Sequence, residues 1–409
     1  DGSSGLFCCP LGHGRKEIAE AVYSQLLEND YTPPFQMGHP GAFDLAQRVA
    51  RITPEPMNHI FFANSGSEAI DTAIKLVWYY HNAIDKPEKK KIIARVNAYH
   101  GTGIASASLT GLDRMHKAFD LPVTNRVLRT DCPHYYRFGE DGETEEDFAT
   151  RCADNLEKLI LDEGPDTVAA FFAEPVMGAG GVLVPAVTYF EKVQAVLKKY
   201  DVLMVSDEVI CGFGRTGNMW GAQTFGIKPD LLTCAKALSS SYLPISAVLV
   251  SEKIYEGIRD QSGDLGGFSH GYTYSGHPVP AAVAVETLKI YEERDIVGQV
   301  RNVAPALQDG LQAFADHPLV GEVRGVGLIA GVEVVADKAT KEAFEPSAKV
   351  GPKIQALAEE NGLLIRAMGD SIGFCPPLII NKETIGEMMT RFAKTLDQTL
   401  AWAEAEKII

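Results

Sequence analysis

Two charged side chains, each placed just after a short apolar run, are the residues of this sequence best placed to do chemistry. Asp207 follows the run 202–205, and Lys236 follows the run 231–235. Uninterrupted apolar runs of this length are typical of strands that are covered on both faces of a parallel sheet. The carboxyl ends of such strands line the crevice in which open α/β sheets bind ligands. We therefore expect a carboxylate and an amine to meet at one edge of a sheet.

This pairing predicts a site for pyridoxal phosphate (PLP). The cofactor needs a lysine amine, with which it forms a Schiff base, and an acidic partner that keeps its ring nitrogen protonated. Lys236 and Asp207 can fill these two roles. In the structural alternative, Asp207 caps the following turn and Lys236 lies at a solvated helix start. The two residues alone leave both interpretations open.

A second motif lies between these two residues but does not predict a nucleotide site. Residues 212–217 fit the pattern G-x-G-x-x-G just after an expected strand. The dinucleotide-binding form of this pattern must open an amphipathic helix, and the sequence downstream lacks the apolar periodicity of such a helix. We interpret the motif as a glycine-rich loop.

Three further apolar strands are expected upstream, and each of them also leads into polar or aromatic residues. They cover residues 59–63, 92–96 and 168–173. Repeated endings of this kind along one sheet edge are harder to explain by chance than a single ending. The residues that follow the three strands are Ser65-Gly66-Ser67-Glu68, Tyr99-His100-Gly101 and Glu174-Pro175.

The first of these endings opens a helix that is expected to run to about His81. Ser65 and Glu68 have the spacing of a capping box, which is a sufficient structural explanation for that pair. The functional interpretation adds a phosphate at the helix N-terminus, where free backbone N–H groups and the helix dipole favour an anion.

The alternation of strands and helices predicts an α/β fold with a mostly parallel, doubly wound sheet. Helical patterns cover 148–161 and 189–200, and a strand is expected at 245–250 before a long loop over 263–280. The remainder predicts a second, smaller α+β domain, with short strands at 332–335 and 363–365 and a final helix over 383–406. We expect a large cofactor-binding domain over residues 41–293 and a small domain built from both chain ends, 1–40 and 294–409.

The composition of the chain limits which partners it can bind and indicates the compartment in which it works. The chain of 409 residues has a net charge of −16, which opposes nonspecific binding to nucleic acid or to an anionic membrane. No apolar run approaches the roughly 18 residues of a membrane span. Seven scattered cysteines, without zinc-ligand spacing, predict neither a disulfide framework nor a structural metal. A reducing, cytoplasmic setting fits this cysteine usage.

Together these motifs carry a family resemblance that runs through nearly the whole chain. The segments 65–68, 99–101, 174–175 and 206–217, with Ala235-Lys236 and the loop HGYTYSGHP, resemble the class III PLP-dependent aminotransferases of fold type I. The opening GLFCCPLGHGRKEIAEAV and Arg366 in LLIRAMGD are similar to the pyruvate-using ω-amine transaminases, including β-alanine–pyruvate transaminase.

The resemblance implies a role for each motif residue. Lys236 would hold the cofactor and shuttle the substrate proton, and Asp207 would pair with the pyridine nitrogen. The substrate pocket would include Phe7, Tyr99 and Arg366. Around the cofactor, the resemblance places Tyr99 and Val209 on the two ring faces, Ser65, Gly66 and Ser67 at the phosphate, His100 and Glu174 behind them, and Thr273 at the phosphate of the neighbouring subunit.

The resemblance also implies the partners and leaves two reactions open. The smallest competent unit would be a homodimer, or a dimer of dimers, with shared active sites. The preferred reaction moves an amino group from a primary amine or ω-amino acid to pyruvate, giving alanine and an aldehyde or ketone. An aminomutase, racemase or lyase would need the same Lys236 and Asp207. Phe7 stands where close relatives often carry tryptophan, and Ala237 and Ser241 also depart from the common pattern.

Overall fold

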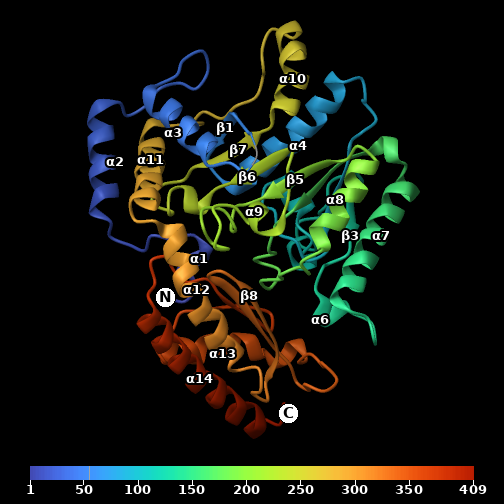
Figure 1. The fold of residues 1–409 in the computed structure, drawn as a ribbon, viewed down its shortest axis with the longest axis vertical. Helices are drawn as coiled ribbons and strands as arrows, with labels where there is room; N and C mark the ends of the chain where they lie inside the picture. Colours follow the sequence, from blue (N-terminus) through green and yellow to red (C-terminus); the bar gives the residue numbers. More distant parts are fainter. Residues whose placement is uncertain (55) are drawn as a thin grey trace.

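A seven-stranded sheet forms the centre of the larger part of the molecule in the computed structural model, which describes residues 1–54 and 56–409 (Figure 1). Its strand order is β1-β7-β6-β5-β4-β2-β3. The five strands from β6 to β3 pair in parallel, whereas β7 runs antiparallel to β6 and to β1. The strands are β1 (His59–Ala63), β2 (Lys91–Arg95), β3 (Val127–Thr130), β4 (Val168–Ala173), β5 (Leu203–Asp207), β6 (Leu231–Cys234) and β7 (Ser246–Val250).

Both faces of the strands β4, β5, β6 and β7 are buried, which explains why these strands are mostly apolar. Successive side chains of a strand point to opposite faces. Phe171 of β4 belongs to a core with the helices α7 (Glu145–Glu163) and α8 (Tyr189–Lys199). Its neighbour Phe172 belongs to a second core with α4 (Gly66–Ala83). The expected mostly parallel, doubly wound sheet is therefore confirmed.

Further helices complete the two faces and the connections. In the larger part they are α2 (Lys16–Glu28), α3 (Pro40–Arg51), α5 (Ile104–Leu109), α6 (Tyr135–Phe138), α9 (Gly221–Phe225), α10 (Glu252–Asp264) and α11 (Pro278–Glu293). Short 3-10 turns are η1 (Asp113–Met115), η2 (Pro165–Thr167), η3 (Lys236–Leu238) and, nearer the C-terminus, η4 (Pro346–Ala348). None of the helices in the described part of the chain is both long enough and apolar enough to cross a membrane.

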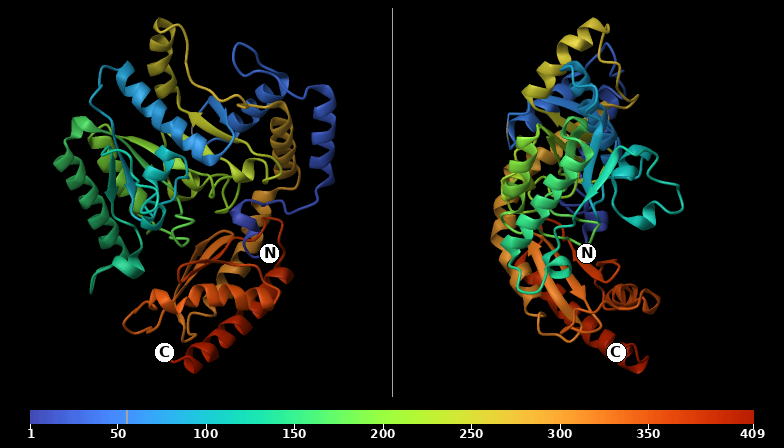
Figure 2. Two further views of the ribbon diagram at one scale, coloured as in Figure 1. Left: turned by 180° about the vertical axis from the view of Figure 1, so that it is seen from behind. Right: turned by 90° about the vertical axis from the view of Figure 1, so that its right-hand side faces the viewer.

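A second, four-stranded antiparallel sheet lies in the lower part of Figure 1, with three helices packed around it. Its order is β10-β11-β9-β8. Both views in Figure 2 show that the C-terminus lies at the far end of this part, while the N-terminus lies where it meets the larger part. The elements are α12 (Ile296–Gln312), β8 (Val320–Val326), β9 (Ile329–Val334), α13 (Val350–Glu360), β10 (Arg366–Met368), β11 (Ser371–Phe374) and α14 (Lys382–Ala405).

The first residues of the chain are bound to the C-terminal part by backbone hydrogen bonds. The Gly2 N–H donates to the carbonyl of Leu364 at 2.8 Å, and the Cys375 N–H donates to the carbonyl of Gly2 at 2.7 Å. The short helix α1 (Ser4–Phe7) follows. In contrast, α2 packs against α11 of the larger part. The N-terminal segment therefore connects the two sheets.

Two details differ from the sequence-based expectation. The predicted strand at 363–365 is wrong: the Leu364 carbonyl accepts from the Gly2 N–H, and the strand β10 begins one residue later at Arg366. The strand β3, which is short and carries Arg129, and the helix α3 were not anticipated, although α3 buries Leu45 and Val49 on one face. The other expected strands and helices are confirmed within a few residues, including the loop after residue 264.

Candidate active site

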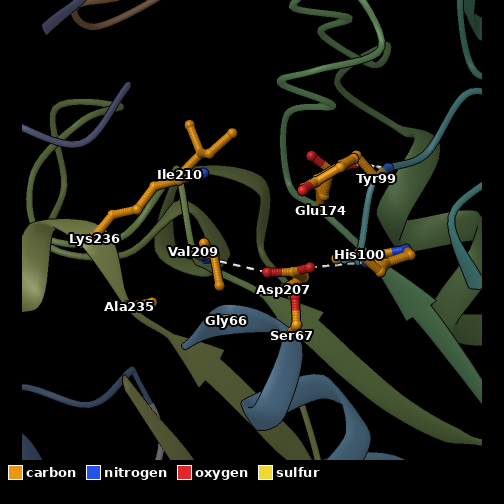
Figure 3. Close-up of a pocket in the computed structure, with 11 residues that line it drawn as sticks. Gly66, Ser67, Tyr99, His100, Glu174, Asp207, Val209, Ile210, Ala235 and Lys236 are labelled. Atoms are coloured by element: carbon orange, nitrogen blue, oxygen red, sulfur yellow. Dashed lines mark hydrogen bonds and ion pairs between the residues drawn. The ribbon is translucent and has the colours of Figure 1, made fainter. Parts of the chain in front are cut away.

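A cavity of about 140 Å³ lies where the carboxyl ends of β2, β4, β5 and β6 meet the N-terminus of α4 (Figure 3). In that view Lys236 lies on one side of the cavity, Tyr99 and His100 lie on the other, and Asp207 lies between them. Eight residues singled out from the sequence line it: Gly66, Ser67, Tyr99, His100, Glu174, Asp207, Val209 and Lys236.

Asp207, the last residue of β5, is buried and held by three polar partners. Its Oδ2 lies 2.8 Å from Nδ1 of His100. Its Oδ1 accepts hydrogen bonds from the Val209 N–H at 3.2 Å and from the Thr233 hydroxyl at 3.3 Å. Such a network fixes the direction of a carboxylate. The far nitrogen of the imidazole, His100 Nε2, is buried without a hydrogen-bond partner among the described residues.

Lys236 enters the cavity from a strained backbone position. Its φ is +41°, in a region that side-chain-bearing residues rarely adopt and that is often found at functional sites. Burial lowers the pKa of the Lys236 ammonium group, and the charges of Asp207 and Glu174 oppose that shift. No described residue forms a hydrogen bond with its Nζ. A desolvated lysine of this kind has more of the free amine that nucleophilic chemistry needs.

The N-terminus of α4 approaches the cavity through Gly66. A Cβ at this position would lie 3.2 Å from a methyl carbon of Val209, closer than most such contacts. Ser65, directly before the helix, does not line the cavity; its hydroxyl oxygen accepts from the Glu68 N–H at 3.2 Å and caps the helix. The reciprocal half of the expected capping box is not formed, because the Glu68 carboxylate accepts from the Asn64 N–H instead.

Glu174 positions the loop that carries Tyr99. Its Oε1 accepts from the Tyr99 N–H and its Oε2 accepts from the Gly178 N–H, each at 3.0 Å. Burial raises the pKa of Glu174, and the nearby charges of His100 and Arg95 lower it. Burial likewise raises the pKa of the Tyr99 phenol. The ring of Tyr99 is thus placed at the cavity by a buried carboxylate that contacts its backbone.

Glu208 follows Asp207 in sequence but points elsewhere. Its carboxylate accepts from the backbone N–H groups of Gly221 at 2.9 Å and Ala222 at 2.6 Å, at the start of α9. Burial raises its pKa to about 7. Glu208 therefore stabilises the start of a short helix, and it does not line the cavity.

Besides Ser65, three predicted site residues lie outside the cavity lining. Arg366 is half-buried at the start of β10, and its positive charge reaches Tyr99, whose pKa it lowers. Phe7 is buried and packs in one cluster with Ile210, which does line the cavity. Thr273 is exposed, and its carbonyl accepts from the Tyr31 hydroxyl at 3.0 Å.

The structure also places residues at the site to which the sequence assigned no role. Ile210, Ala235 and Gly101 also line the cavity. A Cβ at Gly101 would lie 2.6 Å from the Ser67 hydroxyl oxygen, so only glycine fits against the first turn of α4 there. Ile210 and Ala235 lie within the motifs that carry the family resemblance, next to predicted site residues, and that adjacency is the signal that could have found them. Thr233, which donates to Asp207, lies within an apolar run that gave no such signal.

Comparisons with known proteins agree with this geometry. The family described as aminotransferase class-III matches residues 1–396. The chain is 52% identical over 401 residues to gamma aminobutyrate transaminase 3, chloroplastic, from Solanum lycopersicum, covering 98% of this chain and 77% of the relative.

Solved structures show the same fold. An omega transaminase from Pseudomonas jessenii in complex with PMP is 50% identical, with a TM-score of 0.97, and the match covers 98% of this chain and 89% of that one. A structure described as a transaminase with L-Ala is 53% identical, with a TM-score of 0.96, and the match covers 98% of this chain and 95% of that one. The transaminase relatives favour the aminotransferase reaction over the aminomutase, racemase or lyase alternative. The chain belongs to the class-III aminotransferases, which use PLP as their cofactor.

Proposed function

We propose that this aminotransferase moves an amino group from a primary amine or ω-amino acid to pyruvate, giving alanine and an aldehyde or ketone. Arg366 carries this proposal. Among the described residues its guanidinium takes part in no ion pair. Its positive charge is close enough to Tyr99, which lines the cavity, to lower the pKa of that phenol. A guanidinium binds a carboxylate through two parallel charge-assisted hydrogen bonds. An unpaired arginine beside the cavity is therefore suited to the carboxylate of a keto acid.

The residues of the cavity fit PLP in three respects. The Lys236 amine has no competing hydrogen bond among the described residues, and Asp207 is fixed by three partners. The first turn of α4, with Gly66 and Ser67, offers backbone N–H groups to a phosphate. We propose that Lys236 attaches the cofactor and that Asp207 pairs with its ring nitrogen. Tyr99 and Val209 would then cover the two ring faces.

The protein side of the reaction is proton transfer at Lys236 Nζ. Bound PLP supplies an electron sink for the negative charge that remains on a substrate carbon after its proton is removed. Lys236 Nζ would take that proton from the substrate carbon and deliver it to the cofactor. Asp207 would supply the compensating negative charge at the ring nitrogen. Arg366 orients the acceptor carboxylate, and it must swing away for an amine that has no carboxylate there.

We further propose a homodimer, or a dimer of dimers, in which Thr273 completes the phosphate site of the neighbouring subunit. Thr273 is exposed and does not line the cavity of its own chain. Large apolar side chains of the segment before α3 and of its first turn are also exposed, including Phe35, Met37 and Phe43. Exposed apolar patches of this kind mark interaction surfaces.

The proposed cytoplasmic location stays a prediction from the cysteine usage. The tomato relative named above is a chloroplastic protein. Measuring where the full-length protein accumulates in its own cells, by fractionation with organelle markers, tests this prediction independently of the reaction.

The reaction is tested by the amino-group balance of the purified holoenzyme. We expect one alanine for each amine consumed when pyruvate is supplied with γ-aminobutyrate or with an aromatic primary amine. Lys236→Ala is the control and should lose turnover by at least roughly 10²- to 10⁴-fold, the usual value of a general acid–base group. Loss of amine without alanine, or release of ammonia, would refute the proposed reaction. Turnover with another keto acid but not with pyruvate would refute pyruvate as the acceptor and would leave the aminotransferase reaction standing.

A further inference from the structure

Two adjacent thiols lie close together beside the active site. The sulfur atoms of Cys8 and Cys9 are 3.9 Å apart, and both residues are partly exposed. Both sulfurs lie over Gly5, where a Cβ would be 3.5 Å from Cys9 Sγ and 3.6 Å from Cys8 Sγ. The turn that brings them there is sharp, because Gly5 and Phe7 have φ values of 66° and 61°. The other five cysteines, Cys132, Cys152, Cys211, Cys234 and Cys375, are buried.

This thiol pair contacts the segment that carries the catalytic lysine. The carbonyl of Cys8 accepts a hydrogen bond from the Ser241 hydroxyl at 2.8 Å, five residues after Lys236. The Cys8 side chain is near enough to Lys236 to interact electrostatically with that lysine. Phe7, directly before the pair, packs with Ile210 of the cavity wall. A covalent change at the two thiols would therefore act directly on the wall beside the substrate pocket.

We propose that Cys8 and Cys9 form a reversible thiol modification site, which a low-molecular-weight disulfide converts into a Cys8–Cys9 disulfide, and that this bond displaces Phe7 and slows amine turnover. The effect on turnover rests on the proposed function. Formation of the bond does not depend on it.

The reaction balances as two successive thiol–disulfide exchanges. The Cys8 thiolate attacks one sulfur of the reagent, which releases one reagent thiol and leaves a mixed disulfide on Cys8. The Cys9 thiol then gives up its proton and displaces the second reagent thiol, which closes the bond. Two electrons pass from the cysteine pair to the reagent. Burial and the neighbouring Cys8 raise the pKa of the Cys9 thiol to about 11, which disfavours Cys9 as the first nucleophile.

The geometry of neighbouring residues makes this bond reversible. Consecutive Cα atoms are about 3.8 Å apart across a trans peptide, whereas bridged cysteines usually have Cα atoms about 4.4 to 6.8 Å apart. A disulfide between neighbours is therefore strained and more easily reduced than a structural one. Because the strain falls on the backbone next to Phe7, closing the ring must move that residue.

The test uses the holoenzyme and oxidised glutathione as the reagent. After incubation, free thiols are blocked with iodoacetamide, and the tryptic peptide that ends at Arg15 is weighed; it holds both Cys8 and Cys9. We expect this peptide to lack two hydrogen atoms and to carry no blocking group. Alanine formation should fall several-fold in the same sample, and dithiothreitol should restore both the peptide mass and the activity.

Two variants separate the proposal from other effects of oxidation. Cys9→Ser should keep its basal activity, form no bridge and resist the inhibition, whereas Cys152→Ser, on α7, should behave as the natural protein. Alkylation of both cysteines after oxidation, or a cross-link from Cys8 to Cys375, would overturn the proposed bond. Equal inhibition of Cys9→Ser, or a bridge without inhibition, would overturn its effect on turnover. Failure of the proposed function itself would appear separately, as absence of alanine formation by the reduced enzyme.

Discussion

Asp207 and Glu208 are adjacent carboxylates with different tasks, and their hydrogen bonds separate them. Asp207 faces the cavity with partners from His100, Val209 and Thr233. Glu208 turns toward α9. Successive side chains at a strand end point in opposite directions, so only one of the pair can reach the site. Because the Asp207 side chain points to the cavity and the Glu208 side chain points away from it, Asp207 is the carboxylate that can pair with the cofactor.

Asp207→Asn should retain much of the cofactor and lose activity, because a neutral amide cannot keep the ring nitrogen protonated by charge. We expect kcat to fall by roughly 10²- to 10³-fold, the usual cost of removing a group that stabilises developing charge. Cofactor content is measured by absorbance, and kcat by alanine formed. Asp207→Glu is the matched control and should be milder. Full activity in the Asn variant would show that another group carries the charge.

Arg366→Ala should raise the KM for pyruvate strongly. Loss of a charged hydrogen bond costs roughly 1.5 to 3 kcal/mol, which corresponds to a factor of about 10 to 150. The half-reaction with an uncharged amine, followed by the absorbance of the bound cofactor, should change far less. Arg366→Lys, which keeps the charge but not the planar fork, should fall between the two. Equal damage to both half-reactions would indicate a structural role, and an unchanged KM would remove Arg366 from the site.

At the scale of elements, the site depends on what holds each strand end and helix start. The short helix α9 has too few turns to stabilise itself, so its first N–H groups rely on the buried Glu208 carboxylate. The longer α4 uses a serine cap at Ser65, which leaves the N–H groups of its first turn beside the cavity. The first N–H groups of α9 are thus taken up by a buried carboxylate. In α4 the Ser65 cap binds only the Glu68 N–H, so the earlier N–H groups can bind an anion.

Glu208→Ala should lower the free energy of unfolding by about 1 to 3 kcal/mol, because two buried N–H groups lose their acceptor. Burial raises the folded-state pKa of Glu208 from 4.5 to about 7. The folded protein therefore binds more protons in that window, and the contribution of Glu208 to stability falls as pH rises through it. The deficit of the variant should be larger at about pH 5 than at about pH 8.

Thermal unfolding of the holoenzyme at the two pH values measures this deficit. Glu146→Ala, which removes an exposed carboxylate on α7, should change stability by less than about 0.5 kcal/mol. Loss of cofactor from Glu208→Ala without any loss of stability would contradict the assignment and place this carboxylate in the site.

At the scale of the whole molecule, the two sheets are joined by the N-terminal segment. Residues 2–10 bind the segment 364–378, while α2 packs on α11. The domain division predicted from the sequence, 41–293 against 1–40 with 294–409, stays a prediction. The packing of α2 favours a boundary within the N-terminal segment, with the first dozen residues on the side of the smaller sheet.

If the active site is shared between subunits, two inactive variants should restore activity when they form a mixed dimer. Thr273→Ala should weaken cofactor retention, since its hydroxyl would bind the phosphate of the neighbouring subunit. Mixed with Lys236→Ala, it should form heterodimers in which one of the two sites has both residues intact, so activity should partly return. Native mass spectrometry checks that subunits have exchanged. Absence of recovery after confirmed exchange would show that Thr273 serves its own subunit or none.

The sequence by itself determined the class of fold and the chemistry at the strand ends. Asp207 and Lys236 could be recognised because an apolar run followed by a charge is a local pattern, and parallel strands place their carboxyl ends at one edge. The helix starting at Gly66 could be recognised for the same reason, since its cap lies next to it in the chain. Most strands and helices, including β4 and α8, were also predictable from local periodicity.

Tertiary structure alone decided which distant residues share the site and how the sheet is ordered. No local pattern shows that β7 lies between β1 and β6, because strand order depends on crossovers of the chain. Phe7 and Arg366 come together beside the cavity only because the N-terminal segment hydrogen-bonds to residues 364–378. The close approach of the Cys8 and Cys9 sulfur atoms over Gly5 depends on a turn with positive φ angles at Gly5 and Phe7, which apolar periodicity does not predict.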